Sequence, residues 1–190
     1  MKKLLLILTL SSPLSHAAEF TLHESSAIVM DGEIVAGDSA KLYQLISTGK
    51  TNGIIALQSL GGDVSEALLL ATMISTYRMS TIVSTGCYSA CSFIFMSASK
   101  KFIYDTGEVG THVPHIKLAN DVYEEQARSA TWWSLYGLVR GSGLDDKQAK
   151  HFLDKTYVTG YKDLYIINKN NAVEFGVVFK EKLAEEKEKK

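Results

Sequence analysis

Hydrophobic and polar positions follow one another in blocks along the chain, and the blocks predict alternating strands and helices. The continuous apolar run GIIALQSL (53–60) is typical of a strand buried on both faces of a sheet. Residues 64–78 have the apolar spacing of a helix, with Asp63 as a predicted N-cap and Glu66 at the capping-box position. The other predicted strands cover 26–35 (with a turn at Asp31-Gly32), 80–86, 100–105 and 108–114; the other predicted helices cover 37–48, 88–99, 120–143 and 145–157; residues 162–178 give a short strand and a helical turn.

This order predicts an α/β fold with mostly parallel strands joined by right-handed crossovers. Two loops, 60–63 and 86–89, then follow the carboxyl ends of neighbouring strands, the edge where open α/β sheets bind ligands. Each loop leads into a helix N-terminus, where free N–H groups favour negative charge. This edge is therefore the expected site.

The two ends of the chain differ in composition from its middle. Residues 1–17 combine Lys2 and Lys3, a short apolar run and small residues, the pattern of a cleaved secretory signal peptide of bacterial type, so we expect a periplasmic protein. Residues 18–179 form the predicted domain, with a core from about residue 25, and 180–190 form a charged tail outside it. The net charge of −1 gives no indication of the basic surface that nucleic-acid binding needs, so we expect no nucleic-acid partner.

Ser89 occupies a strand-to-helix turn at the expected site, which is the position of a nucleophile; packing of a small residue is the alternative. A serine nucleophile needs a base. His112 and His115 flank the rigid Pro114 at a strand end and are the best-placed candidates, whereas His23 lies before the core and His151 on a polar helix.

Cys87 and Cys91, the only cysteines, bracket Ser89. If both lie on the helix, their Cα atoms are about 6 Å apart, which is within disulfide range. A disulfide, buried free thiols and a Cys87 nucleophile are the alternatives. Two cysteines alone do not complete a zinc site, and we expect no metal or cofactor. Trp132-Trp133 indicates either core packing or an oligomer surface.

Three segments together resemble the Clp-protease proteolytic subunit. IIALQSLGGDVSEALLLATMIS resembles its strand–N-S-P-G-G-x-V–helix segment. STIVSTGCYSACSFIFMSASKKFIYDTGEVGTHVPH resembles its nucleophile, buried helix and H-x-P base, and KDLYIINKNNAVEFGVV its closing segment. Three motifs in order are more specific than one. The resemblance implies the ClpP/crotonase-like fold, with repeated β-β-α and βαβ units, and a homo-oligomer.

By this resemblance Ser89 is the nucleophile, His112 the base and Asp163 the third member of a triad. Gly61 or Gly62, with the Ala90 N–H, forms the implied oxyanion hole.

The sequence also departs from the family pattern. Leu60 replaces a proline, and Cys91 replaces a glycine. An exported protein meets no ATP, so we expect no ATPase partner, and substrates limited to peptides or unfolded proteins.

Three other functions compete with a serine peptidase. One is an inactive, oligomer-forming or binding protein of the same fold, for which a Ser89 Oγ–His112 Nε2 separation beyond about 8 Å is expected instead of about 3 Å. Crotonase-type acyl-CoA chemistry is disfavoured by export. A Ser–Lys dyad is disfavoured because Lys100 and Lys101 lie a helix length from Ser89.

Overall fold

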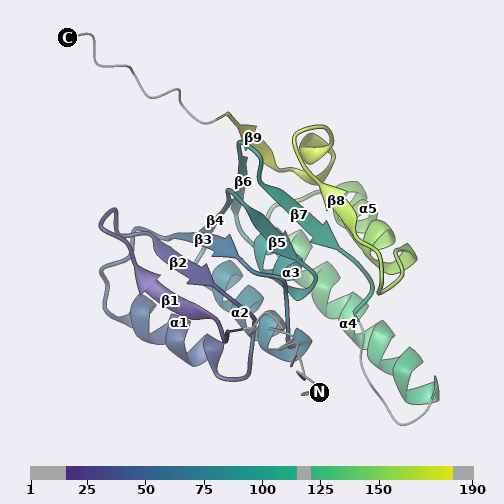
Figure 1. Ribbon diagram of the computed structural model, residues 1–190. Coiled ribbons are helices and arrows are strands. Elements are labelled where there is room, and N and C mark those ends of the chain that lie inside the picture. The colour runs from purple at the N-terminus through teal and green to yellow at the C-terminus, as the bar shows by residue number, and fades with distance from the viewer. Residues whose placement is uncertain (1–15, 115–120, 182–190) are drawn as a thin grey trace, which may run out of the picture.

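The computed structural model describes residues 16–114 and 121–181, and within them two sheets form the framework (Figure 1). The larger sheet has the strand order β1-β2-β3-β4-β6-β9 and the smaller one β5-β7-β8. The larger sheet comprises β1 (Glu19–Leu22), β2 (Ile28–Asp31), β3 (Ile54–Gln58), β4 (Ser80–Val83), β6 (Lys100–Tyr104) and β9 (Val178–Lys180). The smaller comprises β5 (Gly86–Tyr88), β7 (Glu108–Thr111) and β8 (Tyr165–Ile167).

Pairing in the larger sheet is parallel from β2 through β9, as the alternation of strands and helices predicts. The exception is β1, which pairs antiparallel with β2. The sequence prediction was wrong to begin the core near residue 25, because β1 (Glu19–Leu22) already pairs in the sheet. It was also wrong on 33–35: instead of a second short strand, Glu33 and Ile34 make isolated bridges to Ala17 and Gly62.

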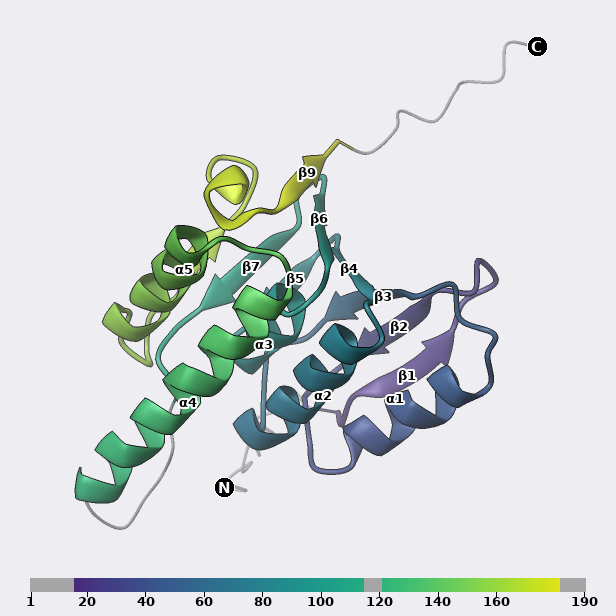
Figure 2. The same ribbon diagram turned by 180° about the vertical axis from the view of Figure 1, so that it is seen from behind.

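The helices are α1 (Asp38–Ser47), α2 (Val64–Thr76), α3 (Ala90–Met96), α4 (Asp121–Gly141) and α5 (Asp146–Val158), with a 3₁₀ helix, η1 (Ala172–Phe175), near the end. Helices α1, α2 and α4 lie on one side of the larger sheet (Figure 2). The Asp63 side chain caps α2 by accepting the Glu66 N–H, as predicted. Glu66 does not complete a capping box, because its carboxylate accepts the Ser39 N–H from α1.

Helix α3 forms the centre of the core, and all seven of its residues are buried. It packs against α2, α4, β5 and β7. Burying one large apolar side chain contributes about 1.5–3 kcal/mol, and α3 buries four in succession, from Phe93 to Met96. The residue before α3 is Ser89, so a helix that is buried along its whole length directly follows the predicted nucleophile.

The two tryptophans of α4 differ in burial, and a role in an oligomer surface stays a prediction. Trp132 packs against the core and stacks on Tyr136, whereas Trp133 is 63% exposed. Lys180, assigned by the sequence to the tail, ends β9. Residues 1–15 of the predicted signal peptide and residues 182–190 of the tail lie outside the described residues. No helix in the described ranges is long and apolar enough to cross a bilayer.

Candidate active site

Ser89 lies in a one-residue turn between β5 and α3. The sequence prediction that Gly86 ends a strand was wrong, because Gly86 begins β5 in the second sheet. Ser89 has φ 53° and ψ −126°, a conformation that few non-glycine residues adopt. Such a residue costs about 1–3 kcal/mol and persists only when its surroundings hold it. Its N–H donates to Gly110 O at 2.8 Å, and its carbonyl accepts from the Ser92 N–H at 2.9 Å.

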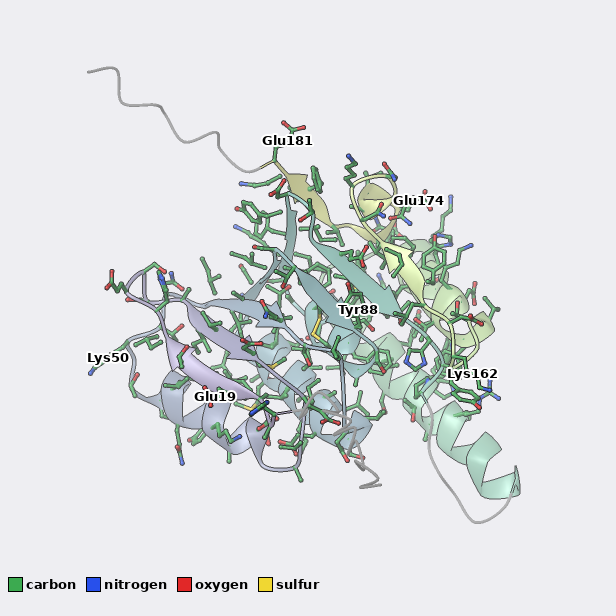
Figure 3. The ribbon with its side chains drawn as sticks, viewed as in Figure 1. Glu19, Lys50, Tyr88, Lys162, Glu174 and Glu181 are labelled. Atoms are coloured by element: carbon green, nitrogen blue, oxygen red, sulfur yellow. A yellow bond between two sulfur atoms is a disulfide. The ribbon has the colours of Figure 1, made fainter. Side chains whose placement is uncertain are left out.

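Cys87 and Cys91 form a disulfide across this turn, visible as a yellow bond in Figure 3. Cys87 belongs to β5 and Cys91 to α3, so the assumption that both lie on one helix was wrong; their Cα atoms are 5.2 Å apart. Both cysteines are fully buried. Because the bridge uses both thiols, neither cysteine is a nucleophile in this form, and the bridge joins the strand before Ser89 to the helix after it.

His112 directly follows β7 and faces Ser89. Its Nε2 lies 2.7 Å from Ser89 Oγ, the distance of a direct hydrogen bond. Strand β7 pairs in parallel with β5, with Gly110 beside Tyr88, so the sheet register places the two loops side by side. The other histidine considered in the same loop, His115, lies outside the described residues.

Asp163 lines the same cavity as Ser89 and His112. It belongs to the loop between α5 and β8, where its N–H donates to Gly160 O at 2.9 Å. The structure brings Asp163 to the site, and its role as third member of a triad stays a prediction.

The Gly61-Gly62 pair passes directly beside Ser89. A Cβ on Gly61 would lie 2.7 Å from Ser89 Cβ, and one on Gly62 would lie 2.1 Å from Ile34 O. Both glycines have positive φ, 106° and 143°, so the sequence needs glycine here on two grounds. The Gly61 N–H already donates to Ser59 Oγ at 3.1 Å. The structure brings the Gly61 backbone into close contact with Ser89 and Ala90, the first residue of α3. The pairing of the Gly61 or Gly62 amide with that of Ala90 in an oxyanion hole stays a prediction.

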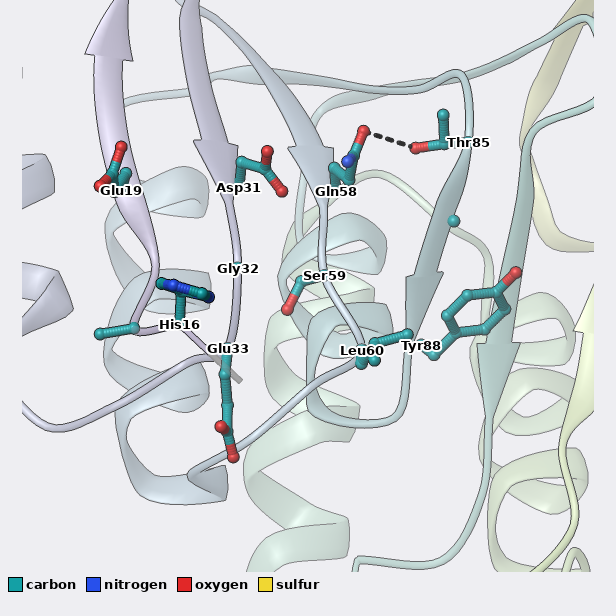
Figure 4. Close-up of a pocket in the computed structure, with 12 residues that line it drawn as sticks. His16, Glu19, Asp31, Gly32, Glu33, Gln58, Ser59, Leu60, Thr85 and Tyr88 are labelled. Carbon is teal, nitrogen blue, oxygen red and sulfur yellow. Dashed lines mark hydrogen bonds between the residues drawn. The ribbon is translucent and has the colours of Figure 1, made fainter. Parts of the chain in front are cut away.

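Two cavities meet at this site. The cavity of about 370 Å³ around Ser89, His112 and Asp163 shares Leu60 and Tyr88 with a second cavity of about 790 Å³. Figure 4 shows the second cavity, with Glu19, Asp31 and Gln58 side by side on adjacent strands. Tyr88 donates to Glu108 at 2.6 Å, and this hydrogen bond raises the pKa of Tyr88 to about 12.

A chain of buried hydroxyls behind the nucleophile was not predicted. Ser92, Thr111 and Thr156 are all fully buried and are joined by hydrogen bonds that begin at the Ser89 carbonyl. The sequence carries one signal for it: Thr156 lies on the apolar face of α5, in register with Ala149, Phe152 and Leu153. Within the described part of the chain, no three His, Cys, Asp or Glu side chains could hold a metal ion together.

Comparisons with known proteins support the fold. No protein-family model matches the chain, and no curated protein matches it in sequence. A solved structure of a ClpP1 mutant from Listeria monocytogenes is similar in fold, with a TM-score of 0.62 at 17% sequence identity, over 84% of this chain and 93% of that one. The chain thus has a ClpP-like fold, a mixed α/β architecture with a mostly parallel sheet.

Proposed function

We propose that this protein is a serine hydrolase that cleaves peptide bonds, with Ser89 as nucleophile and His112 as general base. The 2.7 Å separation of Ser89 Oγ and His112 Nε2 carries the proposal. It matches the separation expected of a nucleophile–base pair and is far below the 8 Å expected of a non-catalytic protein. The ClpP-like fold is consistent with this activity, although likeness of fold alone does not establish it.

In the proposed reaction, Ser89 Oγ attacks the carbonyl carbon of the scissile bond while His112 takes the hydroxyl proton. The Ala90 N–H, together with the N–H of Gly61 or Gly62, stabilises the oxyanion. His112 then protonates the leaving amine as the C–N bond breaks, leaving an acyl-enzyme on Ser89. Water, deprotonated by His112, hydrolyses the ester and restores the hydroxyl. Asp163 orients the imidazole in this scheme.

We further propose that the protein is exported and works without ATP. The sequence of residues 1–17 supports export, and so does the buried Cys87–Cys91 disulfide, since such bonds persist in oxidising compartments. With no ATP supply for an unfolding partner, the substrates are short peptides or chains already unfolded. Its ClpP-like fold makes a homo-oligomer the expected assembly.

Hydrolysis of fluorescently labelled, unfolded casein without nucleotide tests the proposal. The wild-type protein is expected to release fragments, and Ser89→Ala to release none. Ser134→Ala is the matched control, because Ser134 is an exposed serine on α4 whose hydroxyl bonds only to its own helix, at Ala130 O. Equal hydrolysis by wild type and Ser89→Ala, or none by the wild type, would contradict the proposal.

A further inference from the structure

Four contacts link the hydroxyl chain behind Ser89. Ser92 Oγ lies 2.7 Å from Ser89 O and 3.2 Å from Thr111 Oγ1. Thr111 Oγ1 lies 2.8 Å from Thr156 Oγ1, which in turn lies 2.8 Å from Phe152 O. All three hydroxyl residues are fully buried, so each depends on these neighbours for its hydrogen bonds.

Proton counting limits how the chain is arranged. Three hydroxyls carry three hydrogens, so at most three of the four contacts contain a hydrogen at any moment. In one order, Ser92 donates to Thr111, Thr111 to Thr156, and Thr156 to Phe152 O. In the other, Ser92 donates to Ser89 O instead, while Thr111 still donates to Thr156. Thr111 bonds to Thr156 in both orders, and the first order links it to Ser92 as well.

The chain joins the three segments that carry the proposed catalytic residues. Ser92 is in the first turn of α3, the helix that begins directly after Ser89. Thr111 ends β7 and precedes His112. Thr156 belongs to α5, whose C-terminal end leads to the loop of Asp163, and Thr159 O there accepts the Val113 N–H at 3.1 Å. Thr111 is the central member because it contacts both the nucleophile's helix and α5.

We propose that Thr111 is a positioning residue, which holds the backbone beside His112 against the Ser89 turn through Ser92 and against α5 through Thr156. This inference rests on the proposed hydrolase function. Thr111 touches neither substrate nor reacting atoms; it fixes the geometry in which Oγ and Nε2 meet. A misplacement of about 1 Å in a catalytic group can cost about 100-fold in rate, so a small shift of β7 is enough to be measured.

The test compares rates of covalent labelling by a fluorophosphonate probe, which needs no knowledge of the natural substrate. Thr111→Val keeps the size and shape of the side chain and removes only the hydroxyl. We expect it to label about 10- to 100-fold more slowly than the wild type, whereas Thr111→Ser, which restores the hydroxyl, recovers the rate to within about 3-fold.

Thr81→Val is the matched control. Thr81 is also fully buried, and its hydroxyl donates to Phe95 O at 3.1 Å, in β4 of the other sheet. It should lose stability to a similar extent and keep its labelling rate. A purely structural role for Thr111 would lower stability in both variants without separating their labelling rates.

Thr156→Val is the second variant, which breaks the hydroxyl chain at its α5 end. It tests the positioning role if Thr111→Val does not fold. It should slow labelling in the same direction, and the double variant should label no more slowly than Thr111→Val, since both changes break one chain. Labelling of the folded Thr111→Val or Thr156→Val at the wild-type rate would overturn the positioning role while leaving the hydrolase proposal intact. A wild type that does not label at all would overturn both.

Discussion

Breaking the Cys87–Cys91 disulfide should lower the free energy of unfolding and also loosen the turn that holds Ser89. The bridge closes a loop with a sequence separation of only 4, so the loop-entropy relation gives about 2 kcal/mol at 25 °C. The strained turn at Ser89 costs about 1–3 kcal/mol and lies inside the same loop. Because these two energies are similar, the reduced protein should no longer hold Ser89 in its present conformation at all times.

The assay is urea unfolding, followed by fluorescence, of protein equilibrated with and without reductant, together with the rate of fluorophosphonate labelling. Reduction should lower the free energy of unfolding by about 2 kcal/mol. It should also slow labelling, by up to about 30-fold if the whole energy of the bridge supports the turn. Reduction removes no buried heavy atom, so this comparison avoids the cavity that cysteine-to-alanine changes would leave.

The doubly substituted Cys87→Ala/Cys91→Ala protein provides the control, since it should not respond to reductant in either measurement. A loss of less than about 0.5 kcal/mol on reduction would refute the entropy argument. An unchanged labelling rate would show that the hydrogen bonds of the turn hold Ser89 without help from the bridge.

Two further predictions concern Gly61 and Lys101. Gly61→Ala should lose fluorophosphonate labelling, because the new Cβ would lie 2.7 Å from the Cβ of Ser89. Gly37→Ala is the control: Gly37 has a similar φ of 97°, but no atom lies within 4 Å of its added Cβ, so this variant should lose only stability. Equal labelling rates of the two variants would contradict the close-contact argument. Burial lowers the pKa of Lys101 to about 8, below its ordinary 10.5. Between pH 8 and 10.5, Lys101 is therefore protonated in the unfolded chain and neutral in the folded one, so the free energy of unfolding rises with pH in this range. The free energy of unfolding of the wild type should therefore rise by about 2 kcal/mol between pH 7.5 and 10 relative to Lys101→Met, as urea titrations would show; a constant difference would contradict the lowered pKa.

The parts of the fold that the sequence predicted are those in which local pattern and burial agree. Helix α2 has its cap at Asp63, and β3 and β4 are apolar runs bounded by polar turns. The errors fall on short strands whose pairing is decided by tertiary contacts. Strand β5 has only three residues and exists because of its register with β7, which no local pattern of GCY reveals.

The candidate site divides in the same way. The nucleophile turn could be located because a strand end, a helix start and a small polar residue coincide there. Reasoning from the residues left both His112 and His115 as candidate bases, and the choice of His112 depended on the resemblance to a known family, since Ser89 and His112 are 23 apart in sequence. The hydroxyl chain was missed because buried threonines pack much as valines do, and only the position of Thr156 on an apolar helix face marks it.

The most direct test of the account is to locate the covalent adduct after the wild-type protein reacts with a fluorophosphonate probe. Proteolytic digestion and tandem mass spectrometry should place one adduct on Ser89, and His112→Gln should slow its formation by about 100-fold or more. An adduct on another residue, or a rate that does not depend on His112, would contradict the assignment of Ser89 and His112 as nucleophile and base.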